Sequence, residues 1–350
     1  MVYKNDSVFQ VITGKKQWMQ LLFEIGDFDF YHTYDYHCIS KSDGERPKLI
    51  VYRKQDKIIA LPIIVRPISN TDYFDATSVY GYVGPLTKNI TEKFDTLDFQ
   101  LKLNTFFKKE NIISVFTRLN PFLPYQEHVL NKLGKIEKLG KIIYIDLLDS
   151  EIEQTSGYSR TTKRYLKKLK DSCYCKISNE YADILRFIDL YYENMDRVEA
   201  ASEYYFGEKY FRELLNSPDF DAELMFVHLK DTDEAIAAAL IVKTSDRMAQ
   251  YHISGTLMSH LKISPMRFLI DQMRAKCSEE NYNYFNIGGG LGGQNDSLLQ
   301  FKSSLSKKFK TFKVWKYIVD ENVYNKLSNE VKTNPMEKRH RFFPSYRSKF

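Results

Sequence analysis

The chain has 350 residues, of which 43% are hydrophobic, so it is long enough for about two domains that each bury a core. Its 51 basic and 45 acidic side chains give a net charge of +6, which excludes an argument for nucleic-acid binding from overall charge alone. No run approaches the roughly 18 apolar residues of a membrane span, and the start, Met-Val-Tyr-Lys-Asn-Asp, has no apolar signal core. We therefore expect a cytoplasmic protein without a transmembrane segment.

The first 148 residues alternate helical and strand patterns. Apolar residues at helical spacing that end at a glycine predict a helix over 14–26. Two glycines and a proline among aromatic residues in 75–86 predict a rigid loop at a groove. The other expected elements are a hairpin (48–54 and 58–66), a helix (97–109) and two strands (112–118 and 141–148).

The second half repeats this mixture of elements. It predicts helices over 158–170, 181–197, 208–216 and 265–280, a hairpin over 222–230 and 235–243, and strands over 173–178, 247–255 and 282–288. Two units with a similar order of elements indicate an α/β (α+β) protein built from two related halves, although no residue-level repeat joins them.

The four cysteines do not form a metal-binding box. Cys38, Cys173, Cys175 and Cys277 lack the spacing of a zinc site, and we interpret them as free thiols in a reducing compartment. The chain also has no Walker loop, no HExxH and no Gly-x-Ser-x-Gly motif. These absences argue against zinc hydrolysis and hydride transfer, and we expect no metal.

A glycine run follows the last predicted strand. After Asn286 come five glycines in six positions, Gly288, Gly289, Gly290, Gly292 and Gly293, where backbone amides could approach a ligand that any Cβ would block. Lys302 then stands between Phe301 and Leu305, where partial burial would hold its ammonium near a transferring acyl group or a phosphate. We expect this segment to line the active site.

The pair Ser264-Pro265 predicts a helix start, with Ser264 as the N-cap. The free N–H groups of that helix could face an anion at the end of the preceding strand, whereas an ordinary strand-to-helix crossover is the alternative. On that strand His252 alternates with Gln250 and Ser254 and could deprotonate an amine nucleophile. A hydrogen-bonded structural histidine is the alternative for His252.

A basic stripe lies on the helix predicted over 158–170. Arg160, Lys163, Arg164 and Lys167 recur at i, i+3, i+4 and i+7, and Lys168 and Lys170 add to them. Like charges at this spacing repel by a few tenths of a kcal/mol per pair, which favours a partner that carries phosphates. A solvated helix face is the alternative.

Several segments together resemble the FemABX-like branch of the GNAT acyltransferase superfamily, including the BioF2-like acetyltransferase domains. The resemblance spans about residues 30–318. The segments that carry it are 31–37 (Tyr-His-Thr-Tyr-Asp-Tyr-His), 78–86 (Ser-Val-Tyr-Gly-Tyr-Val-Gly-Pro-Leu), the basic helix 160–168, 205–211 (Tyr-Phe-Gly-Glu-Lys-Tyr-Phe), Ser264-Pro265, 286–289 (Asn-Ile-Gly-Gly) and 301–305 (Phe-Lys-Ser-Ser-Leu).

The resemblance implies two fused GNAT-like domains, each a mixed, mostly antiparallel twisted sheet flanked by helices. The first, 1–147, would bind the acceptor, and the C-terminal segment 319–350 could pack back on it; the second, 148–318, would bind the acyl donor. Lys302 matches the lysine of the family's Phe-Lys motif, which lies near the donor. The residues expected at the donor are Ser264, Arg267, Asn286, Gly288, Gly289 and Gly290, and those expected at the acceptor are Tyr36, Tyr80, Gly81, Tyr82, Gly84, Arg160, Lys163, Arg164 and Lys167.

The chain departs from the family pattern at two places. Asn286 stands where the family usually has an aspartate, and the loop 256–265 lacks the glycine-rich pattern of ordinary CoA-binding GNAT enzymes. Fewer bare backbone amides are therefore offered to a pyrophosphate.

The resemblance and the residue patterns together indicate three candidate functions. The first is transfer of an acyl group from acyl-CoA, such as acetyl-CoA, to an amine or hydroxyl of a cell-envelope or polysaccharide precursor. A small-molecule or lipid-linked nucleotide-sugar or glycan would be such an acceptor, and a lipid-linked one would bring the protein into peripheral contact with a membrane. The second is aminoacyl transfer from aminoacyl-tRNA to a peptidoglycan bridge, as in FemX-like proteins. The Arg160 stripe and the tail Lys338-Arg339-His340-Arg341 would then contact the RNA. The sequence contains no long helical arm for tRNA. The third is a non-catalytic module that binds an anionic glycan or nucleic acid.

Overall fold

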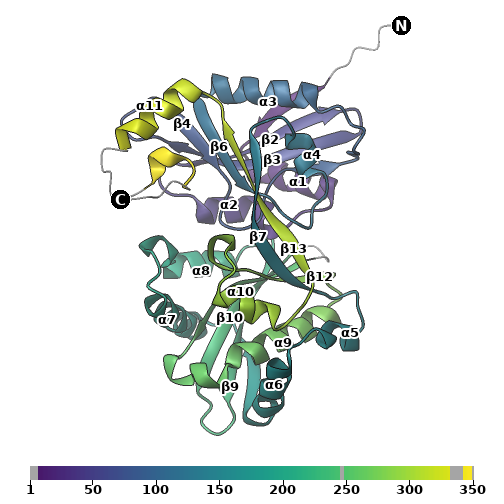
Figure 1. Cartoon of the computed structure of the whole chain (residues 1–350), viewed down its shortest axis with the longest axis vertical. Coiled ribbons are helices and arrows are strands. Elements are labelled where there is room, and N and C mark those ends of the chain that lie inside the picture. The colour runs from purple at the N-terminus through teal and green to yellow at the C-terminus, as the bar shows by residue number, and fades with distance from the viewer. Residues whose placement is uncertain (1–6, 245–247, 332–341, 349–350) are drawn as a thin grey trace. The chain divides into compact units, whose positions relative to one another are not determined.

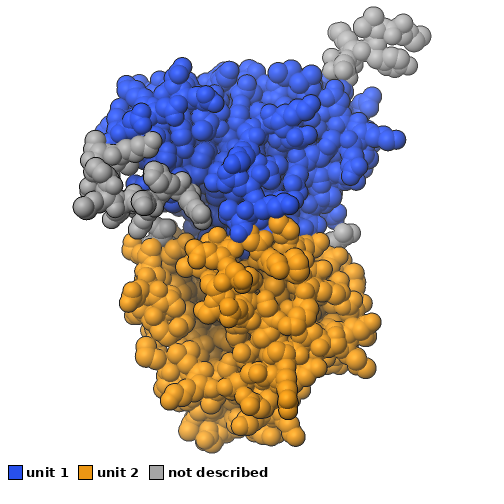
Figure 2. Space-filling view, in the orientation of Figure 1, with its two compact units in different colours: residues 1–139, 312–350 blue, residues 140–311 orange. Residues whose placement is uncertain are grey.

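The computed structural model describes residues 7–244, 248–331 and 342–348, and the tail Lys338-Arg339-His340-Arg341 lies outside them (Figure 1). The chain forms two compact units, 1–139 with 312–350 and 140–311 (Figure 2). The chain passes from one unit to the other within strand β7 (Lys135–Asp146) and again within β13 (Phe309–Ile318). The units therefore divide a few residues before the expected boundaries at 147 and 318, because the connections are strands and not linkers.

The first unit is a mixed sheet with helices on its faces. Its elements are β1 (Val8–Ile12), α1 (Lys15–Ile25), α2 (Tyr34–Ser40), β2 (Arg46–Lys54), β3 (Lys57–Pro67), β4 (Phe74–Thr77), β5 (Leu86–Lys88), α3 (Leu97–Lys109), β6 (Ile112–Arg118), α4 (Gln126–Leu130) and α11 (Glu321–Val331). The strand order is β1-β2-β3-β4-β6-β13, with β5 paired to β3, and only β4 and β6 are parallel among these pairs.

Two apolar clusters hold the helices of this unit on its sheet. Phe99, Leu103 and Phe107 of α3 pack with Trp315 of β13, whereas Trp18 and its neighbours on α1 pack with the other side chains of β2 and β3. Alternate residues of a strand point to opposite faces, so one strand serves both clusters. The predicted helix 97–109 and strand 112–118 are confirmed with the same bounds.

A buried carboxylate joins the C-terminal segment to the first unit. Asp75 of β4 is fully buried and accepts hydrogen bonds from Arg66 Nε at 2.8 Å, from Arg347 and from the Tyr346 hydroxyl at 3.2 Å. The same tyrosine packs with α11 and β6. Asp75 therefore links β4 to residues near the end of the chain.

We expect Asp75→Asn to lower the free energy of unfolding of the first unit by about 1.5–3 kcal/mol, because the amide cannot replace charge-assisted hydrogen bonds to two arginines. The measurement is urea unfolding followed by tryptophan fluorescence, since Trp18 and Trp315 both lie in this unit. Asp72→Asn, a change at an exposed position nearby, is the matched control and should leave the transition in place. Equal transitions for both variants would contradict a stabilising role for Asp75.

The second unit is also a mixed sheet between helices. Its elements, in addition to β7 and the start of β13, are α5 (Glu151–Ser156), α6 (Arg160–Ser172), β8 (Cys173–Ile177), α7 (Tyr181–Arg197), α8 (Glu208–Leu215), β9 (Asp221–Leu229), β10 (Ala235–Thr244), β11 (Met248–Thr256), α9 (Pro265–Glu279), β12 (Tyr284–Gly289) and α10 (Ser297–Ser303). The strand order is β7-β12-β11-β10-β9-β8, and of these pairs only β11 and β12 are parallel.

The helices of this unit cover both faces of its sheet. On one face, Leu166 and Leu169 of α6 pack with the apolar stripe of α9 over β9, β10 and β12. On the other face, α7 lies on β10 and β11 and α8 on β9. The predicted helix 181–197 is confirmed with the same bounds, and α9 buries one apolar stripe, since Leu269, Ile270, Met273 and Cys277 are buried and Met266 packs beside them.

Candidate active site

The second unit contains a place where two neighbouring parallel strands separate. β11 and β12 pair from Met248↔Tyr284 to Gln250↔Asn286, and no further register pair joins their described residues. Beyond this point β11 pairs only with β10, and β12 only with β7. The facing edges of the two strands therefore offer backbone N–H and C=O groups to an extended molecule placed between them.

A β-bulge follows the last pair in each strand. In β11 the register passes from Tyr251↔Ile241 to Ile253↔Leu240, so His252 is the extra residue. In β12 it passes from Asn286↔Tyr144 to Gly288↔Ile143, so Ile287 is the extra residue. Bulges bend a strand and re-aim its side chains, which explains why the strands separate here.

Lys302 lies at this separation. It is buried on α10, and its Nζ donates a hydrogen bond of 2.9 Å to the carbonyl of Gly289 at the end of β12. Its Nζ also lies 6.0 Å from the ring centroid of Tyr251 on β11. Burial lowers the pKa of Lys302 to about 8, against the opposing effect of the Asp296 carboxylate. At neutral pH this side chain is thus a mostly charged donor that can give up a proton at modest cost.

The buried side chain of Asn286 marks the last pair between the two strands. Its Oδ1 accepts a hydrogen bond from the Gly288 N–H at 2.8 Å, while its Nδ2 has no hydrogen-bond partner among the described residues. An orphaned buried amide is costly, so this donor is suited to a carbonyl or anionic oxygen of a ligand. Compared with the aspartate that the FemABX-like resemblance implies here, Asn286 adds a hydrogen-bond donor and removes a charge.

Packing within the chain requires glycine at some positions of the glycine run. A Cβ on Gly289 would lie 2.5 Å from the carbonyl oxygen of Lys141, and one on Gly290 would lie 2.1 Å from that of Gln294. Gly288 has φ 79°, which favours glycine. Packing within the chain is therefore a second reason for glycine at these positions, and whether their backbone also contacts a ligand stays a prediction.

Ser264 and Arg267 lie at the start of α9. Ser264 occupies the N-cap position, but its φ is 55° and its side chain makes no capping hydrogen bond, which corrects the prediction of a side-chain cap. Arg267 is half-buried and donates to the hydroxyls of Thr162 and Ser304, while its Nε has no partner among the described residues. Its guanidinium also lies 4.9 Å from the Phe301 ring centroid. Such a guanidinium, held by hydroxyls, can accept an anion.

Tyr251 and His252 point to opposite faces of β11. The Tyr251 hydroxyl donates to Ser254 and lies 3.4 Å from the Met266 sulfur of α9, on the side of Lys302. His252 Nε2 lies 3.0 Å from the Tyr210 hydroxyl of α8, on the other side. The predicted alternation of Gln250, His252 and Ser254 on one face is wrong, because the bulge at His252 reverses the alternation after it.

His252 is neutral in this environment. Burial lowers its pKa to about 3, so the protein opposes the imidazolium that a general base becomes. The two catalytic candidates, Lys302 and His252, thus belong to the two sides of the strand separation. Tyr251 was not identified from sequence, because no local pattern distinguishes it from a core tyrosine.

The predicted acceptor loop lies in the first unit and is rigidly held. The Tyr36 hydroxyl donates to the Tyr80 carbonyl at 2.9 Å, but Tyr36 itself is fully buried, so it supports the loop and cannot present its ring to an acceptor. Gly81 has φ 125° and Gly84 φ 70°, and a Cβ on Gly81 would lie 2.1 Å from the Tyr31 ring. Tyr80 and the half-buried Tyr82 are the loop side chains that remain accessible.

The basic stripe lies on α6. Arg160, Lys163, Arg164 and Lys167 are all exposed, while Thr162, Leu166 and Leu169 face inward. Arg267 contacts this helix through Thr162. The stripe therefore belongs to the same side of the sheet as Lys302, and it points to solvent.

No helix among the described residues is both long and apolar enough to cross a membrane. Within the described ranges, no three His, Cys, Asp or Glu side chains are grouped so that they could hold a metal ion.

The part of the chain that contains these strands matches a known protein family. Residues 156–302 match the family model of the acetyltransferase (GNAT) domain, a range that contains β11, β12 and Lys302. No curated protein matches the chain. The similarity of this chain to known proteins therefore rests on the domain match and on the fold.

Solved structures share the fold of nearly the whole chain. FemX matches with a TM-score of 0.69 at 12% identity, over 91% of this chain and 99% of FemX. L-PGS from Bacillus licheniformis matches with a TM-score of 0.56 at 13% identity, over 88% of this chain and 93% of that one. A tandem GNAT protein from the clavulanic acid biosynthesis pathway matches with a TM-score of 0.50 at 10% identity, over 90% and 99%. The predicted α/β class with GNAT-like sheets is confirmed.

Proposed function

We propose that the protein is an acyltransferase that moves an acyl group from a thioester donor to an amine, because residues 156–302 match the model of the GNAT acetyltransferase domain and the chain shares the fold of FemX. The observation that carries this proposal is the separation of β11 and β12, with the buried Lys302 ammonium and the orphaned Asn286 amide at its edge. Acyl-CoA is the donor we propose, and a cell-envelope or polysaccharide precursor the acceptor.

The two sides of the separation suit the two substrates. On the α9 side, Arg267 can bind a phosphate of the donor, and the open strand edges can hydrogen-bond its amide groups. On the α8 side, the neutral His252 and Tyr210 offer a hydrogen-bonding pair to an uncharged nucleophile.

The proposed reaction needs no covalent enzyme intermediate. The amine nitrogen attacks the thioester carbonyl carbon, a C–N bond forms, and the carbonyl oxygen becomes an oxyanion that the Lys302 ammonium and backbone N–H groups stabilise. The C–S bond then breaks, the thiolate leaves with the bonding electron pair, and the nitrogen loses one proton to water. With a pKa of about 8, Lys302 can give the departing thiolate a proton, and a proton from water then restores its ammonium.

An aminoacyl-tRNA donor is the alternative. FemX and L-PGS share the fold, while the GNAT domain model favours a coenzyme A thioester. The first experiment is thermal unfolding of the protein with acetyl-CoA, with coenzyme A and with bulk tRNA, because a ligand of the folded state raises stability by about RT ln(1 + [L]/Kd). A shift with the coenzymes supports the proposal. A shift with tRNA alone supports the aminoacyl donor, and no shift supports the non-catalytic module.

We expect the rate of transfer to show no titration from His252 between pH 5 and 8, because its pKa of about 3 keeps it neutral throughout. His252→Gln keeps a hydrogen-bonding group for Tyr210 and should retain the same pH profile. If the imidazole accepts the proton of the attacking nitrogen, the variant's rate should be about 10²-fold lower at every pH. The measurement is kcat/KM against pH for both forms. A limb near 6.5 that disappears in the variant would show that the imidazole titrates normally.

A further inference from the structure

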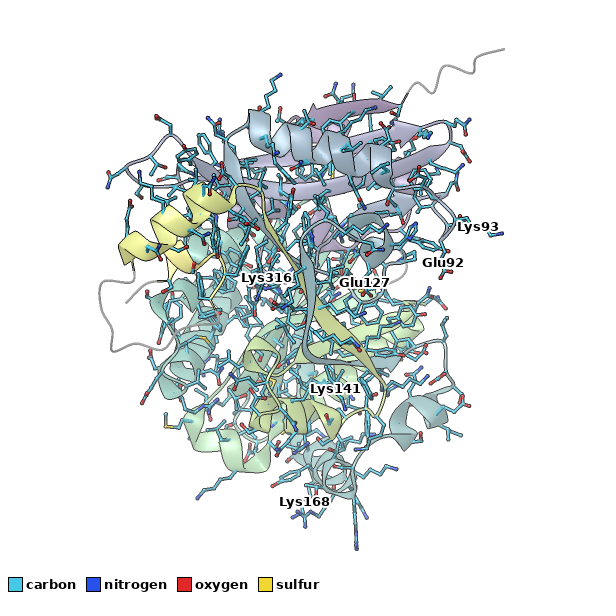
Figure 3. All side chains as sticks on the ribbon, turned by 45° about the horizontal axis from the view of Figure 1, so that its top comes forward. Glu92, Lys93, Glu127, Lys141, Lys168 and Lys316 are labelled. Atoms are coloured by element: carbon cyan, nitrogen blue, oxygen red, sulfur yellow. The ribbon has the colours of Figure 1, made fainter. Side chains whose placement is uncertain are left out.

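Helix α6 carries an exposed basic face that the proposed reaction does not use. Its six cations are all exposed, and none forms an ion pair with another described residue; they are Arg160, Lys163, Arg164, Lys167, Lys168 and Lys170. Lys168, labelled in Figure 3, points from α6 away from the rest of the protein. By contrast, the buried Lys243 of β10 forms ion pairs with Asp221 and Glu280. The six exposed cations of α6 are therefore a concentration of charge that no described acidic side chain neutralises.

Exposed apolar side chains lie beside this basic face. The 3-10 helix η3 (Met258–Ile263) exposes Met258 by 55% and Leu261 and Ile263 by 37% each. Met258 and Leu261 are three residues apart and so share one side of a 3-10 helix. The Tyr165 hydroxyl of α6 donates to the Lys262 carbonyl at 3.2 Å, which fixes η3 against α6.

We propose that α6 and η3 together form a surface that binds an anionic phospholipid bilayer. Cations on one side of a helix with apolar side chains next to them are the pattern of a segment that lies in the membrane interface, where cations meet lipid phosphates and apolar groups enter the acyl boundary. RNA fits less well, because Met258, Leu261 and Ile263 would be left against a charged sugar-phosphate backbone. Contact with lipid is independent of acyl transfer and would bring the enzyme to the membrane surface.

The test is sedimentation with vesicles, without acyl donor or acceptor. Vesicles of phosphatidylglycerol and phosphatidylcholine should bind the protein, and vesicles of phosphatidylcholine alone should not. The triple variant Arg160→Gln, Lys163→Gln, Arg164→Gln should weaken binding by on the order of 100-fold, about fivefold for each cation removed. The single variant Leu261→Asp should also weaken binding to the anionic vesicles, although it leaves all six cations of α6 in place.

A control with the same loss of charge is Lys93→Gln, Lys109→Gln, Lys138→Gln, at three exposed positions of the first unit, and it should bind like the unmodified protein. Circular dichroism verifies that all variants are folded. Equal losses for both triple variants would reduce the effect to net charge and overturn the proposal. Binding of bulk tRNA that depends on α6, with no binding to anionic vesicles, would assign the surface to RNA and also overturn it. Neither outcome bears on acyl transfer, which the acetyl-CoA measurement tests separately.

Discussion

Lys302→Met is expected to lower kcat by about 10²–10³-fold while the affinity for the acyl donor changes little. Methionine has a similar shape, so the change removes mainly the ammonium that the proposed mechanism places at the oxyanion. Loss of one preorganised donor at an oxyanion has this magnitude because the group acts in a site shielded from water. The measurement is release of free coenzyme A with saturating acetyl-CoA and an amine acceptor, together with a binding measurement for the donor.

Lys307→Met is the matched control, because Lys307 is an exposed lysine on the segment that follows α10 and should be dispensable for catalysis. The Lys302 variant also removes the hydrogen bond to the Gly289 carbonyl, so the melting temperature must be recorded. Unchanged kcat in a folded Lys302→Met protein would show that this lysine only holds α10 to the end of β12.

The pH dependence provides an independent test of the same group. Burial lowers the pKa of Lys302 to about 8, so the ammonium is mostly present below pH 8 and is lost as the pH rises through that value. We expect kcat to fall on the alkaline side with an apparent pKa near 8, and the residual activity of Lys302→Met to lack this fall. An alkaline fall that persists in the variant would belong to another group, such as the acceptor amine.

Gly255→Ala is expected to destabilise the second unit by about 3 kcal/mol. A Cβ on Gly255 of β11 would lie 2.2 Å from the carbonyl oxygen and 2.3 Å from the carbonyl carbon of Leu190 on α7. These are backbone atoms, so no side-chain rotation relieves the contact and α7 must move from the sheet. For a domain of this size each kcal/mol lowers the melting temperature by roughly 2–4 °C, which predicts a fall of about 6–12 °C.

Gly207→Ala tests whether this cost comes from close packing. Gly207 precedes α8 in the same unit, has an extended backbone and has no atom within 4 Å of the position of an added Cβ. Its substitution should lower the melting temperature much less than Gly255→Ala, because alanine is a poorer N-cap for α8 than glycine but also restricts the unfolded chain. If both variants melt together, α7 does not approach β11 as closely as these distances require.

Sequence periodicity identified the elements whose apolar residues recur on one face. The helices predicted over 97–109 and 181–197 match α3 and α7 to the residue, and each buries one apolar face. The basic stripe predicted on 158–170 likewise lies on the exposed face of α6, opposite the buried Leu166 and Leu169. These properties are local, because the pattern of a single helix decides which of its side chains the core accepts.

Elements without such a pattern were missed. α10 has only seven residues, and β13 begins in a run of lysines, so neither shows a clear period. The burial of Lys302 depends on α10 packing against the end of β12, and an exposed lysine would have looked the same in sequence.

The sequence by itself determined the α/β class, the basic face of α6 and the position of Lys302 close after the glycine run. Only the tertiary structure decided that β11 and β12 separate after Gln250 and Asn286, and that Tyr251 and His252 point to opposite sides. A bulge depends on the register with strands that lie elsewhere in the sequence, so no local pattern specifies it. For the same reason the glycines could be located but not explained, since the backbone atoms that exclude a Cβ at Gly289 belong to a strand far along the chain.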